Sequence, residues 1–230
     1  MAKILLGATI GDARGSAGAI VYSRNQFGAY IRQKVSPVQP QTNRQTTVRQ
    51  LFTTLAIRWG SVLTDAQRAA WLALAASNPV VDVFGNSQIM TGLQLYMRVN
   101  RNLQECGITV IDAAPADQSV TPLASLSCAF TTSTQVVEVG FSPSPVPADH
   151  SLVVYATPPF SAGKAFFKPL LRLVEVFATA QASAADMSTL YLAKFGAFLE
   201  GQRIGVKAFQ VNTTNGAASP DVFANKLAVA

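Results

Sequence analysis

The sequence is poor in charge, in cysteine and in histidine. Of its 230 residues only 13% are charged, and it has two cysteines and one histidine. A structural zinc site takes about four cysteine, histidine or acidic ligands at regular spacing, so this supply predicts no metal site. A hydrophobic fraction of 49% excludes disorder as the main state, because disordered chains are poor in apolar residues. The composition therefore favours a folded protein that covers part of its surface with a partner.

The patterns of common catalytic sites are missing as well. His150 is the only histidine and follows Pro147-Ala-Asp149, where we expect a turn and an exposed side chain. No Gly-x-Ser-x-Gly nucleophile elbow is present, and the pair Gly163-Lys164 has Pro158 where a phosphate-binding loop needs its first glycine. We therefore expect no catalytic residue, no cofactor and no enzyme. Loss of an activity on changing His150 would instead indicate that the protein is an enzyme.

Long hydrophobic runs are absent. The N-terminal run of two to three apolar residues is shorter than the roughly 7–15 of a signal peptide, and no stretch reaches the ~18 of a membrane span. We expect no membrane partner. Cys106 and Cys128 are expected to be free thiols that are buried or half-buried.

Positive charge is concentrated in the first quarter of the sequence. Residues 1–60 contain eight lysines and arginines against one acid, Asp12, whereas residues 111–230 contain seven bases and eight acids. Such a basic segment suits an acidic partner, which can be a nucleic acid or an acidic protein surface.

Residues 1–36 are glycine-rich and predict a basic β-hairpin arm. The residues 19–23 and 30–35 have strand composition, and Arg24-Asn-Gln-Phe-Gly28 joins them. A two-stranded hairpin is marginal alone in water, so it needs a surface to lie on. We predict that the arm is an assembly anchor, and stacking and phosphate contacts with nucleic acid are the alternative. The residues predicted to form the anchor are Tyr22, Arg24, Phe27, Tyr30, Arg32 and Lys34.

Residues 37–111 predict a helical domain. A helix is expected from Thr42 or Asn43 to about Leu63, because apolar residues recur at steps of three and four. These residues are Val48, Leu51, Phe52, Leu55, Trp59 and Val62. The basic residues off this stripe, which either meet solvent or bind an acidic partner, are Arg44, Arg49 and Arg58.

Two further helices are predicted by capping boxes. Thr64-Asp-Ala-Gln67 and Thr91-Gly-Leu-Gln94 each place a threonine hydroxyl and a glutamine amide where they can satisfy free backbone N–H groups. The second helix is expected to end at Cys106-Gly107. The aromatic residues expected in the helical core are Trp59, Trp71 and Tyr96.

The sequence predicts an α+β protein with two domains. Residues 112–121 are small, polar and punctuated by proline, which is typical of a linker between domains. In residues 122–230 apolar side chains alternate with period two over five to seven short stretches separated by turn residues. This pattern predicts a β-sandwich.

The end of that region has a recognisable pattern. The run Gly201-Gln-Arg-Ile-Gly-Val-Lys-Ala-Phe-Gln-Val-Asn-Thr-Thr-Asn-Gly-Ala-Ala-Ser-Pro220 resembles the last strands of a fibronectin type III or immunoglobulin-like domain. The resemblance implies an all-β sandwich of that type for residues 122–230. Residues 180–195 depart from it, because they lack alternation and have room for a short helix.

The N-terminal half resembles a family of tailed-bacteriophage and prophage proteins. Its pattern is Gly18…Tyr22-Ser-Arg-Asn25…Gly28-x-Tyr30-x-Arg32, then Pro37-x-x-Pro40-x-Thr42 and Gln45…Val48-Arg49, continued by Trp59…Leu63-Thr64-x-x-Gln67-Arg68-x-x-Trp71. The resemblance implies a non-enzymatic virion structural protein, either a capsid decoration (cement) protein or a neck or tail component. Its expected location is the virion, after synthesis in the cytoplasm of the host bacterium.

The resemblance also implies the partners. They are major capsid, neck or tail proteins and copies of the chain itself. A DNA-binding protein associated with the phage genome is the alternative. Binding to phosphates weakens steeply as salt rises, which distinguishes the two.

Overall fold

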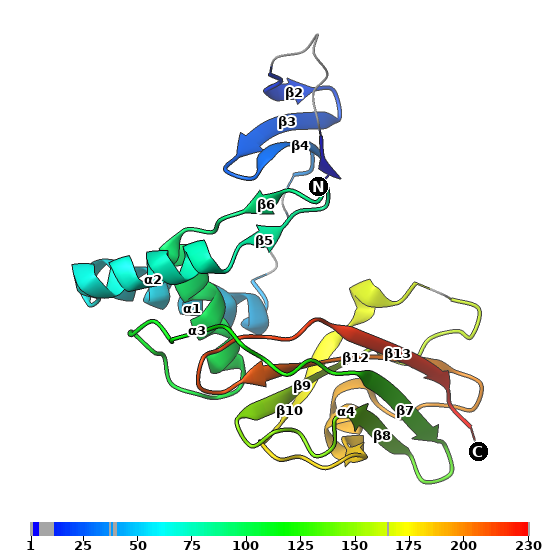
Figure 1. Ribbon diagram of the computed structural model, residues 1–230. Coiled ribbons are helices and arrows are strands. Elements are labelled where there is room, and N and C mark those ends of the chain that lie inside the picture. Colours follow the sequence, from blue (N-terminus) through cyan, green and yellow to red (C-terminus); the bar gives the residue numbers. More distant parts are fainter. Residues whose placement is uncertain (1, 5–11, 37, 39–40, 165, 230) are drawn as a thin grey trace.

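The computed structural model describes residues 2–4, 12–36, 38, 41–164 and 166–229, in which helices combine with four β-sheets. Figure 1 shows the N-terminal sheet at one end, helices in the middle and the sheets of the C-terminal half at the other end. The predicted mixture of helix and sheet is therefore confirmed. Within the described residues, no helix is long and apolar enough to span a membrane.

The N-terminal end is a four-stranded antiparallel sheet, in the order β1-β4-β3-β2. Its strands are β1 (Ala2–Lys3), β2 (Gly15–Ala17), β3 (Ile20–Asn25) and β4 (Gly28–Gln33). The predicted hairpin is β3–β4, with a turn of only Gln26 and Phe27 because Asn25 pairs with Gly28. We call residues 2–4 and 12–36 the arm.

The central helices are α1 (Asn43–Ser61), α2 (Asp65–Ser77) and α3 (Gly92–Glu105). A small hairpin of β5 (Val80–Val81) and β6 (Ser87–Gln88) joins α2 to α3. Both predicted capping boxes are present, and Thr42 with Gln45 forms a third at the start of α1. Gly107 follows α3 with a φ of +74°, as expected of a residue that ends a helix.

The helical core forms around Trp71 and Tyr96, both fully buried, whose rings meet edge to face with centroids 5.4 Å apart. Helix α1 buries only part of its apolar stripe, and Trp59, which the sequence places in the helical core, packs against that core without being fully buried. Leu55 is buried, but Phe52 and Val62 are 41% and 55% exposed and Trp59 is half-buried. The reason is that α1 packs mainly on one neighbour, α3, which cannot cover so wide a stripe.

The C-terminal half, residues 123–229, consists of two facing sheets and a short helix. Its elements are β7 (Ser125–Thr131), β8 (Val136–Ser142), β9 (His150–Ala156), β10 (Arg172–Phe177), β11 (Ala185–Asp186), α4 (Ser188–Phe195), β12 (Arg203–Asn212) and β13 (Val222–Leu227), with a 3₁₀ turn at Lys168–Leu170. One sheet has the order β11-β8-β7 and the other β10-β9-β12-β13. Side chains of alternating residues from both, such as Val137, Val139, Leu152 and Val206, share one core.

The C-terminal half lies directly against α3. The Asn102 amide donates to the carbonyl of Gly216 at 3.0 Å, and the Tyr155 hydroxyl donates to the Glu105 carboxylate at 2.7 Å. The segment predicted as a linker is itself packed at both ends. The Trp71 indole donates to the carbonyl of Asp112 at 2.8 Å, and the Gln118 amide donates to the carbonyl of Asn215 at 2.9 Å.

The expectation of an exposed His150 is wrong. His150 is the first residue of β9 and only 4% exposed. Its Nε2 accepts from the backbone N–H of Thr121 at 3.0 Å, so its Nδ1 carries the proton and donates to Asp149 at 2.7 Å. Both nitrogens thus have partners within the chain, and the histidine connects β9 to the segment before β7.

Gln210 is an exception to the pairing of buried polar groups. Its side chain is fully buried on β12, and neither its amide oxygen nor its nitrogen has a partner among the described residues. An unsatisfied buried amide costs about 1–3 kcal/mol. We expect Gln210→Met to raise the free energy of unfolding by about 1–2 kcal/mol in a denaturant titration. Gln50→Met on the exposed face of α1 is the control, and a destabilised Gln210→Met protein would show that the amide is paired.

Candidate assembly surface

The arm is a sheet without a core. None of its described residues is buried, although an antiparallel sheet normally packs at least one face against other side chains. A sheet of this size is not stable on so few contacts unless something covers it. We therefore expect another surface to pack against the arm.

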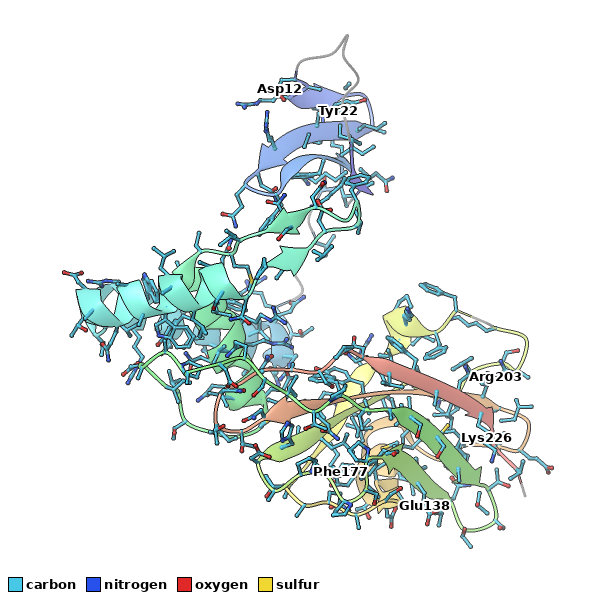
Figure 2. The ribbon with its side chains drawn as sticks, viewed as in Figure 1. Asp12, Tyr22, Glu138, Phe177, Arg203 and Lys226 are labelled. Carbon is cyan, nitrogen blue, oxygen red and sulfur yellow. The ribbon has the colours of Figure 1, made fainter. Side chains whose placement is uncertain are left out.

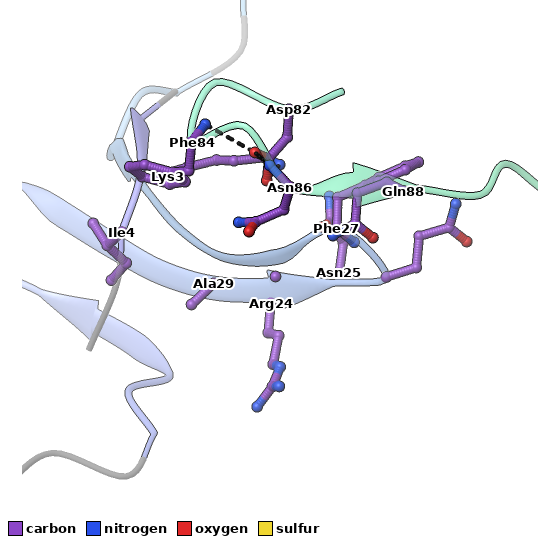
Figure 3. Close-up of a pocket in the computed structure, with 12 residues that line it drawn as sticks. Lys3, Ile4, Arg24, Asn25, Phe27, Ala29, Asp82, Phe84, Asn86 and Gln88 are labelled. Carbon is purple, nitrogen blue, oxygen red and sulfur yellow. Dashed lines mark hydrogen bonds and ion pairs between the residues drawn. The ribbon is translucent and has the colours of Figure 1, made fainter. Parts of the chain in front are cut away.

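The strand register divides the arm into two faces, because directly paired residues of an antiparallel sheet point to the same side. The outer face contains Ala17, Ile20, Tyr22, Arg24 and Ile31, and the inner face contains Lys3, Val21, Tyr30 and Arg32. In Figure 3, Ile4, Ala29 and Arg24 point away from the β5–β6 loop, whereas Lys3, Asn25 and Phe27 lie beside it.

The inner face is connected to the rest of the molecule by a few polar contacts. The Lys3 ammonium lies 2.8 Å from a carboxylate oxygen of Asp82, whose other oxygen accepts the N–H groups of Phe84 and Asn86. The Gln26 amide donates to Gln94, in the capping box of α3, at 2.7 Å. A hollow of about 420 Å³ remains between the arm and the β5–β6 loop.

The Lys3 contact lowers the pKa of Asp82 to about 2 from its ordinary 3.8, with the two backbone N–H groups as lesser causes. A depressed carboxyl pKa stabilises the contact above about pH 4 and loses that effect as the pH falls through 2. We expect the amide NMR signals of Phe84 and Asn86 to titrate with a midpoint near pH 2. The titration should vanish in Asp82→Asn, and a midpoint near pH 4 would mean that Lys3 does not hold this carboxylate.

The outer face is apolar and uncovered by the described residues. Ile20 is 40% exposed. An open hollow of about 490 Å³ lies over this face and is lined by Ala2, Ala19, Ile20, Ile31, Arg32 and Gln33. On the β5–β6 hairpin, Val81 and Ile89 are 66% and 59% exposed, on the side opposite to Asp82 and Gln88 by strand alternation. The arm and the β5–β6 hairpin therefore both expose apolar side chains at this end of the molecule.

The six predicted anchor residues do not form one patch. Tyr22 and Arg24 belong to the outer face, and Tyr30 and Arg32 to the inner one. Phe27 forms the turn, with the Lys3 ammonium 5.9 Å from its ring centre, and Lys34 follows the end of β4. The bases Arg24, Arg32 and Lys34 have no acidic partner within the described part of the chain, so their charge is available.

The three predicted bases of α1 differ from those of the arm. Arg44 lies 2.8 Å from Glu105, and Arg58 makes two contacts of 2.6 and 2.7 Å with Asp112. The hydrogen bond from Arg58 is the main cause that lowers the pKa of Asp112. Arg49 is exposed on the same helix. Two of the three therefore connect α1 to other elements, and α1 does not present three available charges to a phosphate backbone.

The remaining reactive side chains lie away from the arm. Cys106 is half-buried and Cys128 buried, both as free thiols, and burial raises the pKa of each to about 11, which leaves little nucleophilic thiolate at neutral pH. No group of three or more histidine, cysteine or acidic residues in the described ranges is placed to hold a metal ion.

No family model matches the chain, and no curated protein is significantly similar to it. The arm and the sequence patterns are therefore the features from which a function can be inferred.

Proposed function

We propose that the protein is a non-enzymatic structural component of a bacteriophage virion and that the arm docks it to neighbouring virion proteins. The observation that carries this proposal is the four-stranded arm with no buried side chain among its described residues and three bases without acidic partners. Packing on a neighbour would bury the outer face, where Arg24 would meet an acid of that neighbour. Capsid decoration and a neck or tail position both suit such a surface, and the sequence pattern of the N-terminal half supports the phage setting.

We further propose that the C-terminal half is an immunoglobulin or fibronectin type III-like module. The first, second and fifth of its seven strands share one sheet, and the third, sixth and seventh share the other, as in immunoglobulin constant domains. The fourth strand, β10, differs because it joins the sheet of β9. Helix α4 lies in the segment that departs from the alternating pattern. Such modules mediate contacts of many kinds, so the fold supports the structural role without defining the partner.

Deletion of residues 1–36 should abolish incorporation into particles. The helices and the C-terminal half should stay folded, because their cores contain no residue of the arm. The measurement is mass spectrometry of purified particles, calibrated against the major capsid protein, for a strain that expresses the deletion in place of the full chain. Circular dichroism of the deleted protein confirms that it is folded.

A charge variant tests the same proposal without removing the sheet. Arg32→Glu with Lys34→Glu should weaken incorporation more at low salt than at high salt, because exposed charges are screened over about 10 Å at 0.1 M. Normal incorporation of the deletion variant would refute docking by the arm. If instead the full chain binds DNA with a steep salt dependence and the deletion does not, the DNA-binding alternative is correct.

A further inference from the structure

The hollow between the arm and the β5–β6 loop, which we call the inner hollow, is lined by side chains from distant parts of the sequence. The turn between β3 and β4 contributes residues 25–27, and the β5–β6 hairpin contributes Phe84, Asn86 and Gln88. Its volume of about 420 Å³ lies in the range of small-ligand sites, roughly 300–1,000 Å³. The inner hollow is therefore large enough for a small molecule and too small for a folded partner.

The backbone around the inner hollow already has hydrogen-bond partners. Strand β4 is paired with β1 on one side and with β3 on the other, so β4 offers the hollow a face rather than a free edge. In the β5–β6 loop, the N–H groups of Phe84 and Asn86 donate to the Asp82 carboxylate, and the N–H of Asp82 donates to the carbonyl of Asn86. An extended peptide binds by adding to a free strand edge, so this arrangement does not favour a peptide.

Side-chain amides are the polar groups that remain. Those of Asn86 and Gln88 have no hydrogen-bond partner among the described residues. The Asn25 amide uses only its oxygen, which accepts from the N–H of Phe27 at 2.9 Å. In Figure 3, the Asn86 amide points from the β5–β6 loop toward the arm. An amide both donates and accepts hydrogen bonds, and so does a hydroxyl group, so these side chains match a ligand that has several hydroxyl groups.

Charge and apolar surface restrict the ligand further. Asp82 is paired with Lys3 at 2.8 Å, and the Arg24 side chain points away from the loop, so the inner hollow does not select a charged ligand (Figure 3). Phe27 and Phe84 supply aromatic rings, and Phe84 is 44% exposed. A sugar ring has an apolar face of C–H groups that packs on an aromatic ring, and a rim of hydroxyl groups that bonds to planar polar side chains.

We propose that the inner hollow binds a neutral sugar ring, with Asn86 and Gln88 bonding to its hydroxyl groups and Phe27 packed on its apolar face. This site goes beyond the proposed function, because it lies on the inner face of the arm and docking uses the outer face. Figure 2 shows Tyr22, a residue of the outer face, near the end of the arm farthest from the C-terminal half. A free sugar and a surface polysaccharide offer the same ring chemistry.

The test is an NMR titration of the isotope-labelled full-length chain with glucose, galactose, mannose and N-acetylglucosamine. At least one of these sugars should shift the amide signals of Phe27, Asn86 and Gln88 saturably, with a Kd of about 1–10 mM. Asn86→Ala with Gln88→Ala (the amide variant) should weaken binding at least about tenfold, because it removes hydrogen bonds to the ligand. Phe27→Leu, which removes only the flat ring, should weaken it at least about threefold. Gln50→Ala with Asn225→Ala removes two exposed amides elsewhere and should bind as the wild type does.

The polymers dextran, galactan and mannan distinguish the sources of the sugar. A polymer that competes with its monosaccharide assigns the site to a surface polysaccharide, and a polymer that does not compete assigns it to a free sugar. No saturable shift with any of the sugars up to about 100 mM, or wild-type affinity in the amide variant, overturns the inference. Equal shifts caused by a tetra-alanine peptide overturn it as well, because the inner hollow would then be a peptide site. The amide variant should still enter particles, so this inference and the proposed function fail separately.

Discussion

Replacing Trp71 with alanine is expected to lower the free energy of unfolding by about 3–5 kcal/mol, the range for truncating a buried tryptophan. Trp71 is fully buried, its ring packs on Tyr96, and its indole N–H donates to the Asp112 carbonyl at 2.8 Å. The substitution therefore removes a ring from the centre of the helical core and leaves a buried carbonyl without its donor. Chemical denaturation monitored by circular dichroism measures the loss.

Trp59→Ala is the matched comparison. Trp59 also packs on Tyr96, with ring centroids 5.4 Å apart, but it is only half-buried. Its truncation should lower the free energy of unfolding by roughly half as much, since less apolar surface is removed from the core. Equal losses for the two variants, or a larger loss for Trp59→Ala, would contradict the packing described here.

Gly216→Ala is expected to lower the free energy of unfolding by about 2–4 kcal/mol, from backbone strain and overpacking together. Gly216 has a φ of +65°, which an alanine rarely adopts. A Cβ there would lie 2.6 Å from a methyl carbon of Val99 and 2.8 Å from its backbone oxygen, and backbone does not move aside easily. The clash falls where α3 meets the C-terminal half, so hydrogen exchange should rise on both sides of that contact.

Gly107→Ala separates the two causes. Gly107 has a φ of +74°, but nothing lies within 4 Å of the position of its Cβ. The variant should lose about 1 kcal/mol, from backbone strain alone. A Gly216→Ala protein no less stable than Gly107→Ala would mean that α3 does not pack on this turn.

Local patterns predicted the helices well. Each capping box is formed by residues three apart, so its presence can be read from the sequence without knowing the fold. The hairpin β3–β4 was predictable for the same reason. Strands β1 and β2 were not, because they are two and three residues long and exist only by pairing with β4 and β3.

Features that depend on distant pairing could not be read from the sequence. Arg58 meets Asp112 across 54 positions, and Arg44 meets Glu105 across 61, so both appeared as free bases of one helix. His150 is buried because the chain returns at Thr121 to donate to it. The stripe on α1 is only partly covered because α1 packs mainly on α3, which periodicity does not reveal.

The candidate site was predictable as a segment but not as a surface. Alternation of basic and aromatic residues pointed to the arm, yet only the strand register shows that Tyr22 and Arg24 share the outer face while Tyr30 and Arg32 share the inner one. The connection through Lys3 and Asp82 joins residues 79 positions apart and left no local signal. The division of the chain at residues 112–121 stays a prediction, which limited proteolysis between Ala113 and Gln118 would test.

Oxidative footprinting of purified particles tests docking by the arm most directly. The side chains of Tyr22 and Ile20 should be modified in the free protein and protected in particles, because a neighbouring virion protein covers the outer face. Leu72, which is 56% exposed on α2, should be modified equally in both states. If Tyr22 and Ile20 are modified as strongly in particles as in the free protein, no neighbour covers the outer face and the arm does not dock there.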